Sequence, residues 1–288
     1  GNIVEYFGKE KVEEIHEGKT IHVFQDGLLL NQRRSRFNSS SVPKSAVFAK
    51  FLLGDVKNVA EGQSFGNDAL DNPMIWKKIT AGEKNEFQDN GLRSGYLYLE
   101  YQSKKAQNVL FEASGHTMAL INGLPHEGDH YDFGYNLIPV RLKKGNNIFV
   151  LEGGRFARMR ARILAPEKTI AFTKRDMTLP DVLMEESDNL LGAIRVMNIN
   201  QSWFVGGSIT CQIGEKSMKT NLHSISPMNV RKVPFQIPVS VNPDEKKVTY
   251  NLLLKDKRGK ILATTTIDLN VKSKYKHHKN TFLSGIDG

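Results

Sequence analysis

Short runs of β-branched and aromatic residues, separated by Gly, Asn, Asp and Pro, dominate the pattern of apolar and polar positions along the chain. Such runs predict β-strands, and the residues between them tolerate the backbone angles of tight turns. Long stretches with helical periodicity are absent. Segment 11–18 has mixed helix and strand character and stays open. In the first part of the chain the pattern predicts strands at 19–25, 45–53, 94–102, 107–114, 118–124, 137–142, 147–153 and 158–166.

A second group of strands follows a polar stretch near residues 165–168. Residues 173–183 are interpreted as a linker or an edge strand, because Pro180 has no N–H to donate to a neighbouring strand. The last two predicted strands flank Asp-Lys-Arg-Gly and are typical of a hairpin. The strands of this group are predicted at 190–200, 208–214, 231–241, 247–256 and 260–272.

These patterns divide the chain into three parts. We expect a β-sandwich domain at 1–165 and a smaller sandwich of immunoglobulin-like size at 166–275. Residues 276–288 are polar, basic and without periodicity, which indicates a linker toward a further C-terminal domain.

The charge balance invites a nucleic-acid interpretation, since the formal net charge is +9. However, the 40 basic and 31 acidic residues are interspersed along the chain. Nucleic-acid binders more often concentrate basic residues on one stripe and interleave exposed aromatic residues. We therefore expect no nucleic-acid partner, and only a weak, salt-sensitive attraction to acidic polysaccharide.

The single cysteine, Cys211, excludes an internal disulfide framework and a Cys-based zinc site. Its alternating surroundings predict a buried, small apolar residue. No stretch approaches the roughly 18 apolar residues of a membrane span. The chain begins with Gly rather than Met, as a fragment does when its signal peptide or upstream part has been removed. We therefore expect a secreted or periplasmic protein.

Two turn-containing phrases carry a family resemblance. Residues 119–123 read Ala-Leu-Ile-Asn-Gly, and residues 139–147 read Pro-Val-Arg-Leu-Lys-Lys-Gly-Asn-Asn. Over about residues 70–165 the chain is similar to galactose-binding-like jelly rolls, the accessory domains of secreted glycoside hydrolases. The resemblance implies an all-β fold, a galactose-binding-like jelly-roll sandwich followed by an immunoglobulin-like β-sandwich, and an association with carbohydrate.

The layout of the whole chain resembles the N-terminal region of exported bacterial α/β-hydrolases of the esterase or prolyl-oligopeptidase type. This resemblance implies a non-catalytic accessory region that positions a C-terminal hydrolase domain or its substrate. The nucleophile of such a domain sits in a Gly-x-Ser-x-Gly elbow between a strand and a helix. Segments 206–208 and 284–286 lack that elbow, and segment 62–68 is interpreted as a Gly-punctuated loop. The alternative is a stand-alone carbohydrate-binding module.

The strongest candidate site is segment 125–135, Pro-His-Glu-Gly-Asp-His-Tyr-Asp-Phe-Gly-Tyr. Its histidines and carboxylates could bind a divalent metal, or its polar groups could bind sugar hydroxyls while an aromatic ring packs on the sugar. A solvent-facing structural loop is the plainer interpretation. The i, i+4 spacing of two histidines fits zinc poorly, because the Gly between them disfavours a helix. The candidate ligand-binding residues are His126, Asp129, His130, Tyr131 and Tyr135.

We expect no cofactor and no metal at this segment, although jelly-roll relatives often hold a structural calcium, at a position that the sequence does not locate. The eight histidines are scattered, and none has a Ser or Cys partner at a recognisable spacing. We therefore expect no active site in this region.

Three further patterns concern buried and exposed side chains. Trp76 is expected in a core rather than on a sugar-binding surface. Alternation places Tyr96 and Tyr98 on one face of a strand and Leu97 and Leu99 on the other, one of which must be the core. Three arginines at 158, 160 and 162 share one strand face, where they could capture carboxylate or phosphate, but a polar edge that prevents aggregation is the plainer interpretation.

Overall fold

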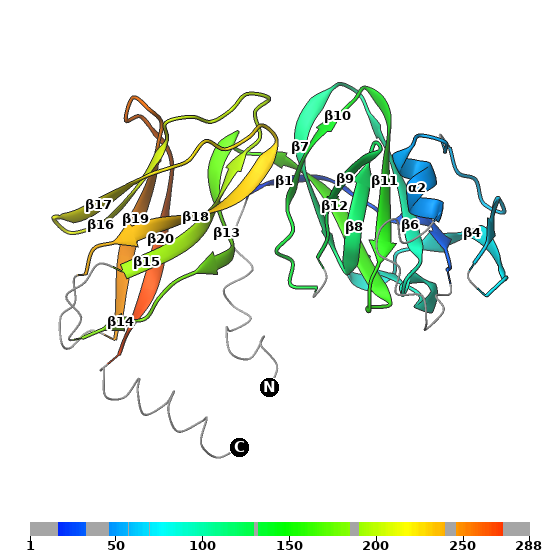
Figure 1. Ribbon diagram of the computed structural model, residues 1–288, viewed down its shortest axis with the longest axis horizontal. Coiled ribbons are helices and arrows are strands. Elements are labelled where there is room, and N and C mark those ends of the chain that lie inside the picture. Colours follow the sequence, from blue (N-terminus) through cyan, green and yellow to red (C-terminus); the bar gives the residue numbers. More distant parts are fainter. Residues whose placement is uncertain are drawn as a thin grey trace, which may run out of the picture. The chain divides into compact units, whose positions relative to one another are not determined.

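The computed structural model describes residues 17–32, 46–56, 58–68, 70–129, 132–184, 190–239 and 246–272. The expected linker at 276–288 and nearly all of segment 11–18 lie outside these residues. The chain divides into two compact units, whose described parts run from 17 to 167 and from 168 to 272 (Figure 1). Each consists of mainly antiparallel sheets packed around an apolar core, so the prediction of an all-β sandwich chain is confirmed. Within the described ranges, no helix is long and apolar enough to cross a membrane.

The first unit contains two sheets. One has the order β1-β12-β7-β10, with β5 also paired to β12; the other has the order β3-β4-β2-β6-β11-β8-β9. Their inward side chains form one core, in which the rings of Phe111 and Phe149 lie 4.8 Å apart. The strands are β1 (Gly18–Val23), β2 (Asp26–Leu30), β3 (Ser64–Asn67), β4 (Pro73–Thr80), β5 (Phe87–Gln88), β6 (Tyr96–Ser103), β7 (Gln107–Ser114), β8 (His116–Ile121), β9 (Leu124–Glu127), β10 (Ile138–Leu142), β11 (Gly145–Gly153) and β12 (Arg158–Pro166).

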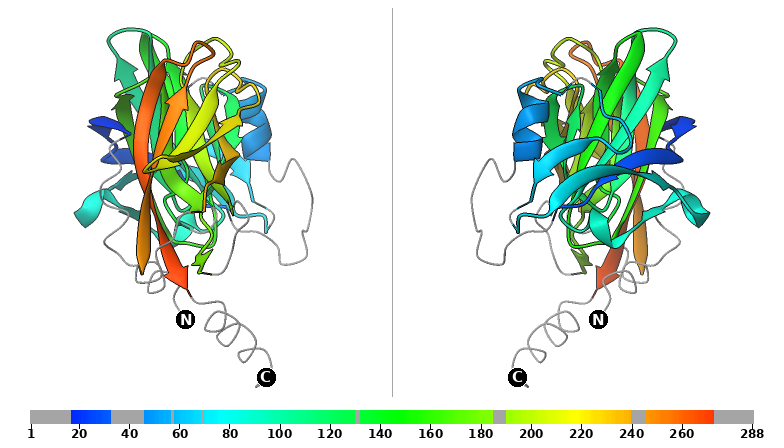
Figure 2. Two further views of the ribbon diagram at one scale, coloured as in Figure 1. Left: turned by 90° about the vertical axis from the view of Figure 1, so that its left-hand side faces the viewer. Right: turned by 90° about the vertical axis from the view of Figure 1, so that its right-hand side faces the viewer.

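The strand prediction at 45–53 is wrong. This segment forms helix α2 (Ala46–Leu52), which covers the outer face of the seven-stranded sheet (Figures 1 and 2). Val47, Phe48 and Phe51 are buried there in a second apolar cluster. A short run that is apolar at most positions fits a strand and a helix equally well. A helix forms its hydrogen bonds within the segment, so it can pack on the face of a sheet without a neighbouring strand.

The second cluster explains why β6 is buried on both faces. Leu97 and Leu99 face the sandwich core, while Tyr96 and Tyr98 lie in the cluster beneath α2. The Tyr98 hydroxyl donates a 2.5 Å hydrogen bond to Glu100 Oε1, and burial raises the pKa of the phenol. The sequence required one buried face of this strand, and the helix adds the other.

Trp76 also belongs to the second cluster and is fully buried, as predicted. Its indole lies edge-on to Phe51, Phe65 and Tyr98, with ring centroids 6.2, 5.9 and 5.9 Å away. It is therefore a packing residue and offers no surface to a sugar.

The second unit is a sandwich of a three-stranded sheet, β13-β15-β18, and a five-stranded sheet, β14-β20-β19-β16-β17. Segment 173–183, interpreted as a linker or an edge strand, contains the end of edge strand β13 and all of β14, which pairs in parallel with β20. The immunoglobulin-like assignment of this sandwich stays a prediction. The strands are β13 (Ile170–Thr178), β14 (Val182–Leu183), β15 (Leu190–Asn198), β16 (Ser208–Ile213), β17 (Lys216–Asn221), β18 (Asn229–Ile237), β19 (Lys247–Lys255) and β20 (Ile261–Lys272).

Cys211 lies in the core of this second sandwich with no exposed surface, as the alternation predicted. Burial raises the pKa of its thiol from 9.0 to about 12, because the thiolate would lose its hydration. We expect the folded protein to resist a disulfide thiol reagent at pH 8 and to react quickly in denaturant. The thiol stays protonated in the folded state while the unfolded thiol ionises above about pH 9, so this group lowers stability as the pH rises toward 12. Rapid labelling of the native protein at pH 8 would contradict the assignment.

Candidate functional site

Segment 125–135 begins as a strand rather than a loop. Its first residues belong to β9, which pairs with β8 so that His126 lies opposite Ala119. Burial lowers the pKa of His126, which favours the neutral imidazole. His130 and Tyr131 lie outside the described residues.

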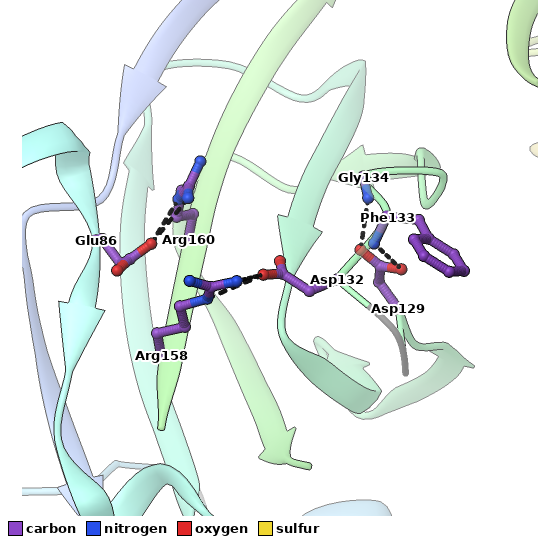
Figure 3. Close-up of polar contacts among 7 residues, drawn as sticks. All are labelled: Glu86, Asp129, Asp132, Phe133, Gly134, Arg158 and Arg160. Carbon is purple, nitrogen blue, oxygen red and sulfur yellow. Dashed lines mark hydrogen bonds and ion pairs between the residues drawn. The ribbon is translucent and has the colours of Figure 1, made fainter. Parts of the chain in front are cut away.

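Asp129 closes the loop that follows β9 (Figure 3). It is 6% exposed, and its carboxylate accepts hydrogen bonds from the backbone N–H groups of Phe133, at 3.2 Å, and Gly134, at 2.8 Å. The backbone N–H of Asp132 donates to the carbonyl oxygen of Asp129 at 3.2 Å. The predicted ligand-binding carboxylate at 129 is therefore engaged in shaping the loop, as Asp side chains commonly do.

Asp132 forms the second anchor of the loop. Its Oδ2 accepts hydrogen bonds from Nε of Arg158 at 3.0 Å and from Nη2 at 2.5 Å (Figure 3). Asp129 lies two residues after the end of β9, and Arg158 is the first residue of β12, so the described part of the loop is tied to two strands.

Arg158 starts a row of three ion pairs on β12. Arg160 contacts Glu86 at 2.9 Å, and Arg162 contacts Glu112 at 2.7 Å. The alternation thus places the three guanidinium groups on one face, where each binds a carboxylate of the chain itself. The interpretation as a polar strand edge is wrong, because β12 pairs with β1 and β5 on one side and β7 on the other. Such half-exposed pairs contribute about 0–1 kcal/mol each to stability.

An exposed aromatic pair occupies the outer part of the loop. Phe133 and Tyr135 are 40% and 39% exposed, and their ring centroids lie 5.3 Å apart at an interplanar angle of 43°. The two rings are therefore tilted and do not form one flat platform. Further along the chain, Arg155 and Arg158 place their guanidinium carbons 4.8 and 5.6 Å from the ring centre of Phe156.

Tyr135 was predicted from the sequence as a ligand-binding residue, but its partner Phe133 was not. The sequence signal for Phe133 was the tetrapeptide Asp-Phe-Gly-Tyr at 132–135, in which a single Gly separates two aromatic residues. In the structure that Gly has a φ of 69°. Within the described ranges, no group of three His, Cys, Asp or Glu side chains is arranged to hold a metal ion. A metal bound by the histidines and carboxylates of this segment would use His126, Asp129 and His130. His130 lies outside the described residues, and Asp129 accepts a hydrogen bond from the backbone N–H of Gly134.

The two phrases that carried the family resemblance meet in the structure. Asn122 and Gly123 have φ of 51° and 83° and form the two-residue turn between β8 and β9. Asn122 Nδ2 donates to Asn147 Oδ1 at 3.0 Å, and Asn122 Oδ1 accepts from the N–H of Ile148 at 3.0 Å. The fingerprint therefore describes a structural link between two turns and not a ligand site.

Segment 62–66 reads Gly-Gln-Ser-Phe-Gly and so matches the letters of a nucleophile elbow. The structure places Ser64 at the first position of β3, opposite Ile75, and the next element is the strand β4. A nucleophile elbow requires a strand-to-helix turn. The loop interpretation is thus replaced by a β-hairpin, and the motif has no elbow geometry.

No protein-family model matches the chain, and neither does any curated protein. Among solved structures, it is similar to a calcium-binding mutant of β-glucuronidase 2 from Bacteroides uniformis, with 12% identity and a TM-score of 0.36 over 86% of this chain and 32% of that one. A GH2 β-galacturonidase from Eisenbergiella tayi has 11% identity and a TM-score of 0.37, covering 90% of this chain and 44% of its own. The exo-chitosanase CsxA of Amycolatopsis orientalis has 11% identity and a TM-score of 0.36, covering 86% and 33%.

The chain thus spans less than half the length of each of these glycoside hydrolases. None of the three is an esterase or a prolyl oligopeptidase, so that part of the layout resemblance stays a prediction. At these TM-scores and identities, the similarity carries no inference about a ligand or a reaction.

Proposed function

We propose that the chain is a non-catalytic, carbohydrate-associated β-sandwich region in which segment 125–135 contacts sugar. The observation that carries the proposal is the exposed pair of Phe133 and Tyr135 on a loop anchored by Asp129 and Asp132. The hydrogen bonds that hold the backbone of Phe133 and Gly134 before binding reduce the conformational entropy lost when a ligand arrives.

The chemistry of the pair suits a sugar better than a metal. A pyranose packs its apolar C–H face on an aromatic ring, and the Tyr135 hydroxyl can donate and accept hydrogen bonds with sugar hydroxyls. Because the rings are tilted by 43°, one sugar ring would stack on one side chain and meet the other at its edge. Asp129 and Asp132 already accept hydrogen bonds within the chain, which supports an anchoring role for both acids.

In the wider proposal, this region belongs to an exported, multidomain hydrolase of the esterase or prolyl-oligopeptidase type and positions its catalytic domain or substrate. The region is then secreted or periplasmic and by itself hydrolyses nothing. The second candidate function is a stand-alone carbohydrate-binding module, which the same aromatic pair would also serve.

The test is to compare Phe133→Ala and Tyr135→Ala with the unmodified chain on a glycan array, followed by affinity electrophoresis in the best polysaccharide. We expect each variant to lose about fivefold to tenfold in affinity, the usual effect of truncating an aromatic contact at a binding site. Leu124→Ala is the matched control, because Leu124 is 64% exposed on the neighbouring β9 and is not part of the pair.

The proposal fails if the unmodified chain binds no glycan on the array. It also fails if the Leu124 variant loses as much affinity as the two aromatic variants, because the loss would then not depend on the pair.

A further inference from the structure

The connection between β15 and β16, residues 199–207, carries an exposed tryptophan. Trp203 is 60% exposed and Val205 is 55% exposed, whereas Phe204 between them is partly buried and packs against the core of the second unit. The chain contains two tryptophans, and the other, Trp76, is fully buried. An indole left this open to water is unusual, because Trp is highly buried on average.

The loop around Trp203 is held on both sides. Asn198 is fully buried, and its Nδ2 donates to the carbonyl oxygen of Ser202 at 2.9 Å, directly before the tryptophan. Directly after it, the backbone of Phe204 exchanges two 3.0 Å hydrogen bonds with Ile225. The same Asn198 amide also donates to the carbonyl oxygen of Ile225 at 3.1 Å. The exposed ring is therefore presented by an ordered loop rather than by a frayed one.

A basic turn adjoins this loop. A methyl group added to Gly206 would lie 3.0 Å from Cβ of Lys257, in the turn that connects β19 and β20. That turn contains exposed Lys257, Arg258 and Lys260, and its acid, Asp256, accepts the backbone N–H groups of residues 258 and 260 at 2.9 Å each. Among the described residues, no ion pair involves these three cations. The connections 199–207 and 222–228 contain no acidic residue, and the turn holds three cations against one acid. A net positive turn therefore contacts the loop at Gly206, three residues after Trp203.

We propose that the Trp203 surface, defined as residues 201–206 with the turn 256–260, binds an acidic polysaccharide. The indole would stack on a sugar ring, the exposed Gln201 and Ser202 would bind hydroxyls, and Lys257 and Arg258 would pair with carboxylates. Amide and hydroxyl groups beside a single ring favour a sugar chain over an acidic protein segment. The inference extends the proposed carbohydrate role to a second surface, in the other unit of the chain, and rests on that role.

The first measurement uses the two tryptophans as reporters. Iodide and caesium quench exposed indole, and positive charge around Trp203 should raise the ratio of iodide to caesium quenching at low salt above the ratio for uncharged N-acetyltryptophanamide. We expect Lys257→Ala to reduce the iodide preference and Lys219→Ala, which removes an exposed lysine on β17, to leave it unchanged. A ratio in the unmodified chain no higher than that of N-acetyltryptophanamide would show that Trp203 lies in no positive field and would overturn the inference.

The second measurement titrates the chain with polygalacturonate and with its fully methyl-esterified form by isothermal titration calorimetry, a readout that the Trp203→Ala variant does not lose. We expect binding to the acid form that weakens with added salt, and about tenfold loss in Trp203→Ala. Leu191→Ala is the control, because Leu191 is 66% exposed at the far end of β15.

Three outcomes would overturn the inference: equal affinity for the esterified polymer, tighter binding of oligothymidylate or polyglutamate, and no effect of Trp203→Ala. Tyr135→Ala should keep its affinity for polygalacturonate. If that variant alone loses acid-glycan binding, the first site is supported and the Trp203 surface is not.

Discussion

Alanine in place of Trp76 is expected to lower the free energy of unfolding of the first unit by about 4 kcal/mol, within the range for a fully buried tryptophan. The side chain fills the space between α2 and the outer face of the seven-stranded sheet, where it contacts Phe51, Phe65 and Tyr98. Its indole nitrogen has no hydrogen-bond partner among the described residues, so the loss would be one of packing alone. Trp76→Phe keeps most of that packing and should cost less than half as much.

The measurement is urea unfolding, followed by far-ultraviolet circular dichroism. Tryptophan fluorescence is unsuitable, because the tryptophan that remains in the variant, Trp203, reports on the second unit. Ile75→Ala is the matched control, since Ile75 precedes Trp76 on β4 and is 37% exposed. A loss of similar size in both variants would show that the cluster under α2 does not stabilise the unit as described.

Leucine in place of Asn147 is expected to cost about 3 kcal/mol, because several buried polar groups would lose their partners together. The Asn147 side chain is fully buried and donates to the carbonyl oxygens of Lys143, at 2.9 Å, and Gly145, at 3.0 Å. Its Oδ1 accepts from the N–H of Lys143 at 2.9 Å and from Asn122 at 3.0 Å. Leucine has a similar volume but satisfies none of these groups.

Thermal and urea unfolding would measure the loss, with the exposed Asn90→Ala as control. A double-mutant cycle between Asn122→Ala and Asn147→Ala isolates the link between the two turns, and we expect a coupling of about 1 kcal/mol. Strictly additive effects would mean that the two turns are stabilised independently.

The sequence predicted which segment forms the candidate site, but not which residues of that segment contact one another. Tyr135 was identified because aromatic and polar residues are mixed in segment 125–135. The role of Asp132 depends on Arg158, which lies 26 residues further along the chain. The hydrogen bonds of Asp129 to the backbone of Phe133 and Gly134 could not be derived from the sequence, because a carboxylate that caps its own loop and one that binds a ligand are the same residue type. Its role as a ligand-binding residue stays a prediction.

Strand alternation, the Asn-Gly turn at 122–123 and the burial of Cys211 could all be derived from sequence, because each depends on a residue and its immediate neighbours. These local signals determined that the protein is made of β-sandwiches. Tertiary structure alone decided that residues 46–52 form a helix, that both faces of β6 are buried, and that Trp203 stays exposed on an ordered loop. In each case the outcome depends on partners distant in sequence: an outer sheet face that needs a cover, and a buried Asn198 that ties the loop to another connection. Which face of an element is buried is a property of what packs against it, and a single strand or helix does not contain that information.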